Sequence, residues 1–133
     1  MFLDFFTNVD ERGSLISLHE NEEIPFEIKR IYYIYGNHLN LSRGYHAHVN
    51  LEQIAIAVNG SCNLMLDDGI SKKIYKLDSP NKGVYIGKMH WREMYDFSKD
   101  CVLLVIASNN YDKNDYISDY ENFLERVRQI NAK

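Results

Sequence analysis

The stretch "RGYHAHVNLEQIAIAVNG", residues 43–60, decides the fold class of this chain. It holds short apolar runs and ends in Asn59-Gly60, the strongest short signal for a two-residue hairpin turn. A second turn signal, Asp68-Gly69, follows closely. Because parallel strands need long crossover connections, strands this closely spaced predict an all-β fold of antiparallel strands, closed into a sandwich or barrel.

Similar runs, rich in β-branched and aromatic residues and divided by turn residues, recur along the chain and predict further strands. They are residues 14–20, 28–36, 52–60, 62–69, 72–78, 83–87, 92–98 and 101–108. The last segment, residues 114–130, instead has apolar residues at helical spacing, with acidic residues early and arginines late. It predicts one C-terminal amphipathic α-helix that covers the barrel. Its apolar positions are Tyr116, Tyr120, Phe123, Leu124, Val127 and Ile130.

Length and composition exclude several classes of protein. The chain has 133 residues, so we expect a single domain over residues 1–133. A net charge of −4 offers no basic surface for nucleic acid. The longest apolar run, residues 102–107, is far shorter than the roughly 20 residues that span a membrane. The N-terminus does not look like a signal peptide, and Cys62 and Cys101 are expected to be two buried thiols, so we expect a cytoplasmic protein.

The two histidines in the opening stretch are the first candidate site residues. His46 and His48 are two residues apart, so on a strand they point to the same face. Glu52 shares their parity if the strand stays regular, and Gln53 alternates onto the opposite face. A cluster of titratable side chains that faces the interior of a barrel is costly to bury, so it is a candidate for function.

Three functions fit this cluster. His46, His48 and Glu52 could bind iron, nickel, manganese or zinc, with His90 as a fourth ligand, which is the ligand pattern of the cupin barrels. The histidines could instead move protons, because a pair of imidazoles can hold one donor and one acceptor at neutral pH. In the third reading, the barrel binds a small molecule without catalysis.

Several motifs follow one another along the chain: "DERGSL" (10–15), "RGYHAH" (43–48) with "LEQ" (51–53), "LDSP" (77–80) and "DYI" (115–117). In order and spacing they resemble the dTDP-4-keto-6-deoxyglucose 3,4-ketoisomerases, also called WxcM-like sugar ketoisomerases. The resemblance extends from about Asp10 to Phe123. It implies a cupin-type jelly roll and a homodimer that exchanges N-terminal strands.

The resemblance also implies an activity. These enzymes convert a dTDP-linked 4-keto-6-deoxyhexose into its 3-keto isomer without metal or organic cofactor, in deoxyaminosugar biosynthesis for glycans such as lipopolysaccharide. The catalytic pair of the family matches His46 and His48, and the active-site tyrosine matches Tyr35 or its neighbour Tyr33. One histidine is expected to remove the hydrogen at C3 and the other to assist protonation at C4 of a 3,4-enediol.

The resemblance places the nucleotide on arginines, whose planar guanidinium binds pyrophosphate with two parallel hydrogen bonds. Arg12, Arg30 and Arg43 match these positions, and Arg43 reaches the interior if Gly44 introduces a β-bulge. Trp91 could flank the thymine ring or fill the core. His90, immediately before it, departs from the family pattern. It keeps open the alternative of a metal-dependent cupin, beside that of a non-catalytic sugar-binding cupin.

Overall fold

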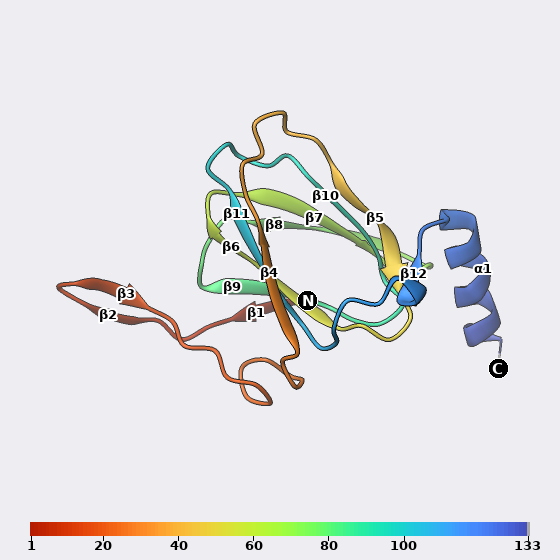
Figure 1. Ribbon diagram of the computed structural model, residues 1–133, viewed down its shortest axis with the longest axis horizontal. Coiled ribbons are helices and arrows are strands. Elements are labelled where there is room, and N and C mark those ends of the chain that lie inside the picture. The colour runs from red at the N-terminus through yellow and green to blue at the C-terminus, as the bar shows by residue number, and fades with distance from the viewer. Residues whose placement is uncertain (133) are drawn as a thin grey trace.

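The computed structural model describes residues 1–132, which form two antiparallel sheets of five strands that enclose an interior core (Figure 1). The first sheet has the order β1 (Phe2–Asp4), β9 (Lys82–Ile86), β6 (Gln53–Asn59), β11 (Val102–Ala107) and β4 (Arg30–Ile34). The second has the order β12 (Tyr116–Ile117), β5 (Arg43–His48), β10 (Trp91–Tyr95), β7 (Cys62–Asp67) and β8 (Lys72–Leu77). The prediction of an all-β antiparallel fold is confirmed.

The two turn signals of the sequence have different outcomes. Asp68-Gly69 lies between β7 and β8, which pair as a hairpin, as predicted. Asn59-Gly60 does not close a hairpin, because β6 pairs with β9 and β11 while β7 pairs with β10 and β8. This turn carries the chain from one sheet to the other. Gly60 has a φ of +67°, so the turn still needs the residue that the signal supplies.

Alternating residues of the strands fill the interior, as the period of two requires. Ala55, Leu64, Val84 and Leu103 are fully or almost fully buried there, and Cys62 and Cys101 are free buried thiols among them, as expected. The outer face of the first sheet is covered in part by the N-terminal segment. Phe5, Ile24 and Phe26 pack there against Ile54, Ile56 and Ile106.

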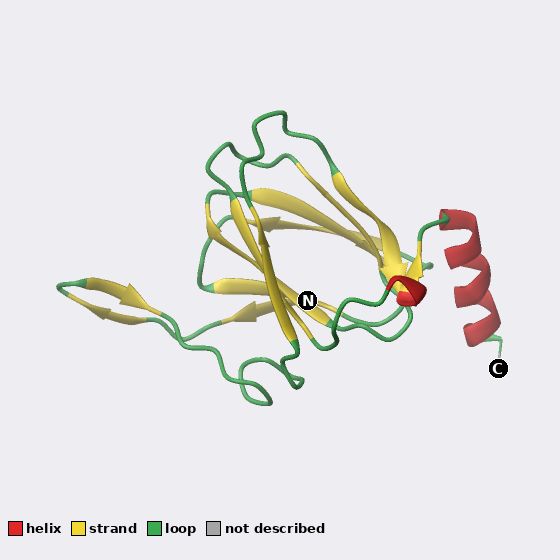
Figure 2. Cartoon of the chain, in the orientation of Figure 1, coloured by secondary structure: helices red, strands yellow, loops and turns green. Residues whose placement is uncertain are grey.

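The C-terminal segment is only partly the helix that was predicted. A short 3-10 turn, η1 (Lys113–Asp115), leads into β12, which pairs with β5, and the helix α1 (Tyr120–Asn131) begins after Asp119. The carboxylate of Asp119 accepts a hydrogen bond from the amide of Glu121 and so caps the helix. Helical spacing over residues 114–130 therefore concealed a strand. In Figure 2 the helix lies beside the end of the barrel.

One pair of strands leaves the barrel. β2 (Asn8–Asp10) and β3 (Gly13–Leu15) pair only with each other, and Figure 1 shows this hairpin extending away from both sheets. Its apolar side chains are exposed, with Val9 at 73% and Leu15 at 58%. Within residues 1–132 no helix is long and apolar enough to cross a membrane.

Candidate active site

The strand that carries the histidines, β5, contains the predicted β-bulge. Arg92 of β10 lies opposite His46, but the next residue, Glu93, lies opposite Gly44, so Tyr45 is the extra residue. Gly44 and Tyr45 have positive φ angles of 99° and 59°. Gly44 has to be glycine, because a Cβ there would lie 2.7 Å from the carbonyl oxygen of Arg92.

The bulge changes the face of the sheet to which the side chain of Arg43 points. Arg43 lies opposite Met94, whose side chain belongs to the interior core. Residues directly opposite each other in a sheet point to the same face, so Arg43 starts on the interior side, as His46 does. Arg43 itself is exposed at the rim.

The two histidines lie side by side at one end of the interior. Their ring centroids are 4.9 Å apart and the rings are nearly perpendicular, at 88°. His48 is buried and His46 is half-buried. Each ring is held through Nδ1: that of His46 lies 3.0 Å from the carbonyl oxygen of Gly44, and that of His48 lies 3.2 Å from Oδ2 of Asp115.

A buried arginine lies beside the histidines. The guanidinium of Arg92, 1% exposed, donates to Oε1 of Gln53 and to the carbonyl of His90. Gln53 in turn donates from Nε2 to the hydroxyl oxygen of Tyr32, at 2.9 Å. Since a guanidinium only donates, the oxygen of Gln53 has to face it. The Tyr32 hydroxyl therefore accepts from Gln53 and keeps its own proton free to donate.

A second tyrosine packs against both imidazoles. The ring centroid of Tyr116 lies 4.8 Å from the ring centroid of His46 and 4.3 Å from that of His48. Tyr116 reaches this position because β12 pairs it with His48 on β5. Tyr111, at 5.9 Å from Tyr116, continues the aromatic wall.

A second guanidinium borders this wall. Arg30 of β4 lies over the rings of Tyr32 and Tyr111, at 5.1 Å and 5.9 Å. Its Nε and that of Arg92 are buried with no hydrogen-bond partner among the described residues. Unpaired donors that are buried are costly, so this end of the barrel is suited to a polar ligand that accepts hydrogen bonds.

Burial and the arginines set the charges of the site. Burial lowers the pKa of His46, and burial followed by Arg92 lowers the pKa of His48 to about 3. Burial also raises the pKa of Tyr116. At neutral pH both imidazoles are therefore neutral and can accept protons, while Tyr116 keeps its hydroxyl proton.

A model of the family described as FdtA, WxcM-like, C-terminal, matches residues 1–128. The chain belongs to this family. It is 48% identical over 131 residues to TDP-4-oxo-6-deoxy-alpha-D-glucose-3,4-oxoisomerase of Aneurinibacillus thermoaerophilus, an alignment that covers 98% of this chain and 94% of that protein. The resemblance recognised in the sequence is confirmed.

Solved structures of 3,4-ketoisomerases have the same fold. The crystal structure of a 3,4-ketoisomerase from Helicobacter canadensis is 51% identical, with a TM-score of 0.93 over 96% of each chain. A mutant of the 3,4-ketoisomerase QdtA from Thermoanaerobacterium thermosaccharolyticum, in complex with TDP-4-keto-6-deoxyglucose, is 40% identical, with a TM-score of 0.93 over 97% of this chain and 94% of that one. These relatives are isomerases, and the prediction of a cupin-type fold is confirmed.

The metal-binding set that was the alternative for this WxcM-like chain is not assembled. Glu52 turns to the outer face of the first sheet, where its carboxylate accepts a hydrogen bond from Tyr85. The parity argument for Glu52 fails because β5 and β6 belong to different sheets and the loop between them resets the alternation. His90 is tied through Nδ1 to the carbonyl of Lys88. Within residues 1–132, the one cluster with ligand spacing is His19, Glu22 and Glu23, on the surface.

The predictions for the aromatic residues need correction. Tyr33 and Tyr35 are 63% and 71% exposed, and alternation along β4 turns Tyr33 away from the interior while Tyr32 faces it. The structure therefore brings Tyr32, and not these two, toward the histidines. Trp91 is 4% exposed and packs against Tyr120 and Phe123 under the helix, so its position contradicts a contact with thymine.

The three predicted arginines lie in different places. Arg30 and Arg43 belong to strands that border the site. Arg12 lies in the turn of the protruding hairpin, where it pairs with Asp10 at 2.6 Å. The structure does not bring Arg12 to the histidines of its own chain.

Sequence reasoning missed Tyr32, Gln53, Arg92, Asp115 and Tyr116. For Tyr32 a signal exists, because it shares parity with Arg30, which matches a nucleotide-binding position of the family. For Asp115 and Tyr116 the signal is the motif "DYI" (115–117), which also fits the helical spacing of residues 114–130. Arg92 lies in a strand that also holds Glu93, and alternation alone does not say which of these two charged residues faces the interior.

Proposed function

We propose that this protein is a TDP-4-keto-6-deoxyglucose 3,4-ketoisomerase. The observation that carries the proposal is the pair of neutral imidazoles, 4.9 Å apart, at an end of the barrel that also holds two tyrosines and two guanidinium groups. The relatives support the substrate, since one is named for the oxoisomerase reaction and another was crystallised with the keto sugar.

The reaction is a balanced exchange between adjacent carbons. The C4 ketone acidifies the hydrogen on C3, so an imidazole of His46 or His48 can take that proton. The C3–H electrons form a C3=C4 double bond, and the C4 oxygen takes a proton from a neighbouring donor and becomes a hydroxyl. The imidazole then gives its proton to C4, and the C3 hydroxyl gives its proton to the group that served as that donor, which leaves a ketone at C3. Oxidation at C3 balances reduction at C4, so no external oxidant is needed.

Charge that develops on the enediolate oxygens needs donors. The free hydroxyl protons of Tyr32 and Tyr116 and the charged guanidinium of Arg92 lie beside the histidines. Burial lowers the pKa of Arg92 to about 10, so the group remains charged at neutral pH. Donors aimed at such an oxyanion contribute about 3 kcal/mol each in other enzymes.

The nucleotide is proposed to bind to Arg30 and Arg43 at the rim, and to Arg12 of a second subunit. Arg12 lies in the turn of a hairpin that leaves its own barrel, which favours a role in a neighbouring subunit. We propose a homodimer that exchanges this hairpin.

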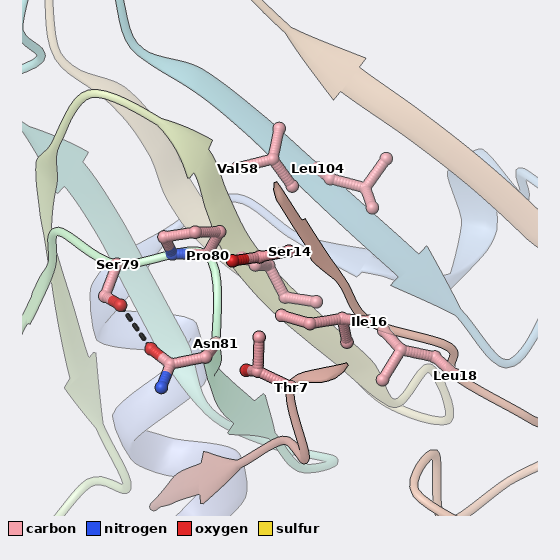
Figure 3. Close-up of a pocket in the computed structure, with 10 residues that line it drawn as sticks. Thr7, Ser14, Ile16, Leu18, Val58, Ser79, Pro80, Asn81 and Leu104 are labelled. Carbon is pink, nitrogen blue, oxygen red and sulfur yellow. Dashed lines mark hydrogen bonds between the residues drawn. The ribbon is translucent and has the colours of Figure 1, made fainter. Parts of the chain in front are cut away.

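The outer face of the first sheet supports the homodimer. A groove of about 630 Å³ lies there. Figure 3 shows the side chains of Ile16, Leu18, Val58 and Leu104 along it. The groove lies away from the histidines and its lining is mainly apolar, so it suits a second copy of the chain better than a sugar nucleotide. The hairpin beside it exposes Val9, which association would bury.

Product analysis tests the proposed activity. Purified protein is incubated with TDP-4-keto-6-deoxyglucose, and the sugar is followed by NMR. We expect the 4-keto signals to give way to those of a 3-keto isomer. Unchanged substrate after prolonged incubation, with the protein folded, would contradict the proposal.

The free thiols of Cys62 and Cys101 fit the cytoplasmic location that we propose.

A further inference from the structure

Asp115 ties together three elements behind the catalytic pair. Its Oδ1 accepts from the amide of Asn50 at 2.9 Å, and its Oδ2 accepts from the amide of Leu51 at 3.2 Å. The same Oδ2 lies 3.2 Å from Nδ1 of His48, and the carboxylate is only 11% exposed. The backbone carbonyl of Asp115 also accepts from Val49. The residue thus joins η1 to His48 of β5 and to the loop that follows β5.

This geometry fixes where the proton of neutral His48 sits. A carboxylate has lone pairs but no hydrogen to give, so an imidazole nitrogen that is hydrogen-bonded to it has to carry the proton. Nδ1 of His48 is therefore the N–H, and Nε2 has its lone pair free. A carboxylate that accepts two backbone amides cannot rotate freely, so the ring is held in orientation as well.

We infer that Asp115 is a positioning residue, which holds His48 as the Nδ1-protonated tautomer and thereby makes Nε2 its proton acceptor. The inference rests on the proposed isomerase function for its catalytic consequence, but the tautomer itself can be observed without any reaction. Asp115 acts through His48 and does not itself take the substrate proton.

His46 is held by the same logic, through the carbonyl of Gly44. Both neutral rings therefore offer Nε2 as an acceptor, and neither has an N–H to donate from that atom. The expected division into one donor and one acceptor does not exist in the resting state. An imidazole becomes a donor only after it has taken the proton from C3, and it then can return that proton to C4.

The test compares two substitutions at η1, one at Asp115 in the turn and one at Asp112, its N-cap. Asp115→Asn puts an amide in place of the carboxylate, and its NH₂ would donate to Nδ1 and move the ring proton to Nε2. Asp112→Asn is the matched control, because Asp112 is exposed and its carboxylate accepts from the amide of Asn114, with no hydrogen bond to His48 among the described residues. Histidine-labelled protein without substrate is examined by ¹⁵N NMR, and the His48 signals are those missing from His48→Gln.

In wild type and Asp112→Asn, Nδ1 of His48 should carry the proton, and in Asp115→Asn, Nε2 should carry it. The kcat of Asp115→Asn should fall by roughly 10²-fold or more while KM stays within about twofold, since the wrong tautomer disables the base without removing substrate contacts. Asp112→Asn should retain wild-type kcat.

Two results would overturn the inference. One is a wild-type spectrum with the His48 proton on Nε2, which needs no variant to fold. The other is Asp115→Asn with the proton still on Nδ1 or with kcat within about threefold of wild type. If wild type proves inactive on the keto sugar, the proposed function fails, and the spectra still decide the role of Asp115.

Discussion

Glu52 and Gln53 are neighbours in the chain, at the start of β6, but their side chains lie on opposite faces of the first sheet. Gln53 accepts from Arg92 inside the barrel, and Glu52 accepts from Tyr85 outside it. The metal-ligand spacing of the cupins predicts the carboxylate of Glu52 beside the histidines, but the side chain that faces the interior there is the amide of Gln53. The chemistry we propose follows from this exchange, because a neutral amide linked to Arg92 and Tyr32 orders donors and is a poor ligand for a metal ion.

Substitution of this neighbouring pair separates the two chemistries. Glu52→Gln should keep turnover within about twofold, because it alters only the outer face. Gln53→Leu should lower turnover at least tenfold, because it leaves Arg92 and Tyr32 without their common partner. Initial rates of isomerisation measure both. If Glu52→Gln abolishes activity, and if removal of a stoichiometric metal from wild type does the same, the metal-dependent alternative is favoured instead.

The protein should lose stability as the pH is lowered, because His48 is buried in its neutral form. Its native pKa is lowered to about 3, while the unfolded chain titrates near 6.5, so below pH 6.5 the unfolded state binds a proton that the native state does not. Between pH 7 and pH 5 this linkage should cost the wild type about 2 kcal/mol. His48→Gln should lack that part of the loss. Denaturant melts at the two pH values measure the difference, and equal losses in both proteins would show that His48 is not buried neutral.

Trp91 and Arg43 should show opposite responses. Trp91→Phe should lower the melting temperature and leave KM unchanged, because Trp91 packs under the helix against Phe123. Arg43→Ala should raise KM for the sugar nucleotide by roughly tenfold with little change in melting, since Arg43 is exposed at the rim. Steady-state kinetics and thermal melts of both variants provide the comparison. A raised KM for Trp91→Phe would return the tryptophan to the nucleotide site.

The protruding hairpin should carry the dimer. Leu15→Asp places a charge at an exposed apolar position of β3 and should give monomers in sedimentation velocity. KM should rise, because Arg12 would no longer reach a second subunit. Ile70→Asp is the control, because Ile70 is 80% exposed in the turn between β7 and β8. It should sediment as wild type does. A wild-type protein that is monomeric at micromolar concentration would refute the exchange.

The sequence predicts the parts of this molecule that depend on local periodicity. The strands from β4 to β11, the bulge at Gly44 and the shared face of His46 and His48 follow from alternation and from the freedom of glycine at positive φ. The strand predicted over residues 14–20 was wrong beyond Leu15, where β3 ends. Residues that depend on a change of sheet were misjudged. The loop between β5 and β6 resets the alternation, so Glu52 does not face the side that His46 and His48 face. Asn59-Gly60 connects the two sheets, where a hairpin was expected.

The helix prediction for the C-terminal segment was partly wrong for a different reason. Tyr116 and Asp115 reach the histidines through a two-residue strand and a single 3-10 turn, elements too short to leave a periodic signal. Tyr116 and Tyr120 are four residues apart, which fits helical spacing by coincidence, so the pattern over residues 114–130 predicts a helix at Tyr116 as well. Tertiary pairing of β12 with β5 decides its structure.

His46 and His48 are proposed to carry hydrogen between C3 and C4 of the sugar. Isomerisation of TDP-4-keto-6-deoxyglucose in deuterated water by wild type, His46→Asn and His48→Asn, followed by NMR, tests this role. We expect deuterium on the sugar carbons with wild type, and a loss of at least about 10²-fold in turnover for each variant, with melting little changed at pH 8. Wild-type rates in both variants, with label still entering the sugar, would contradict it.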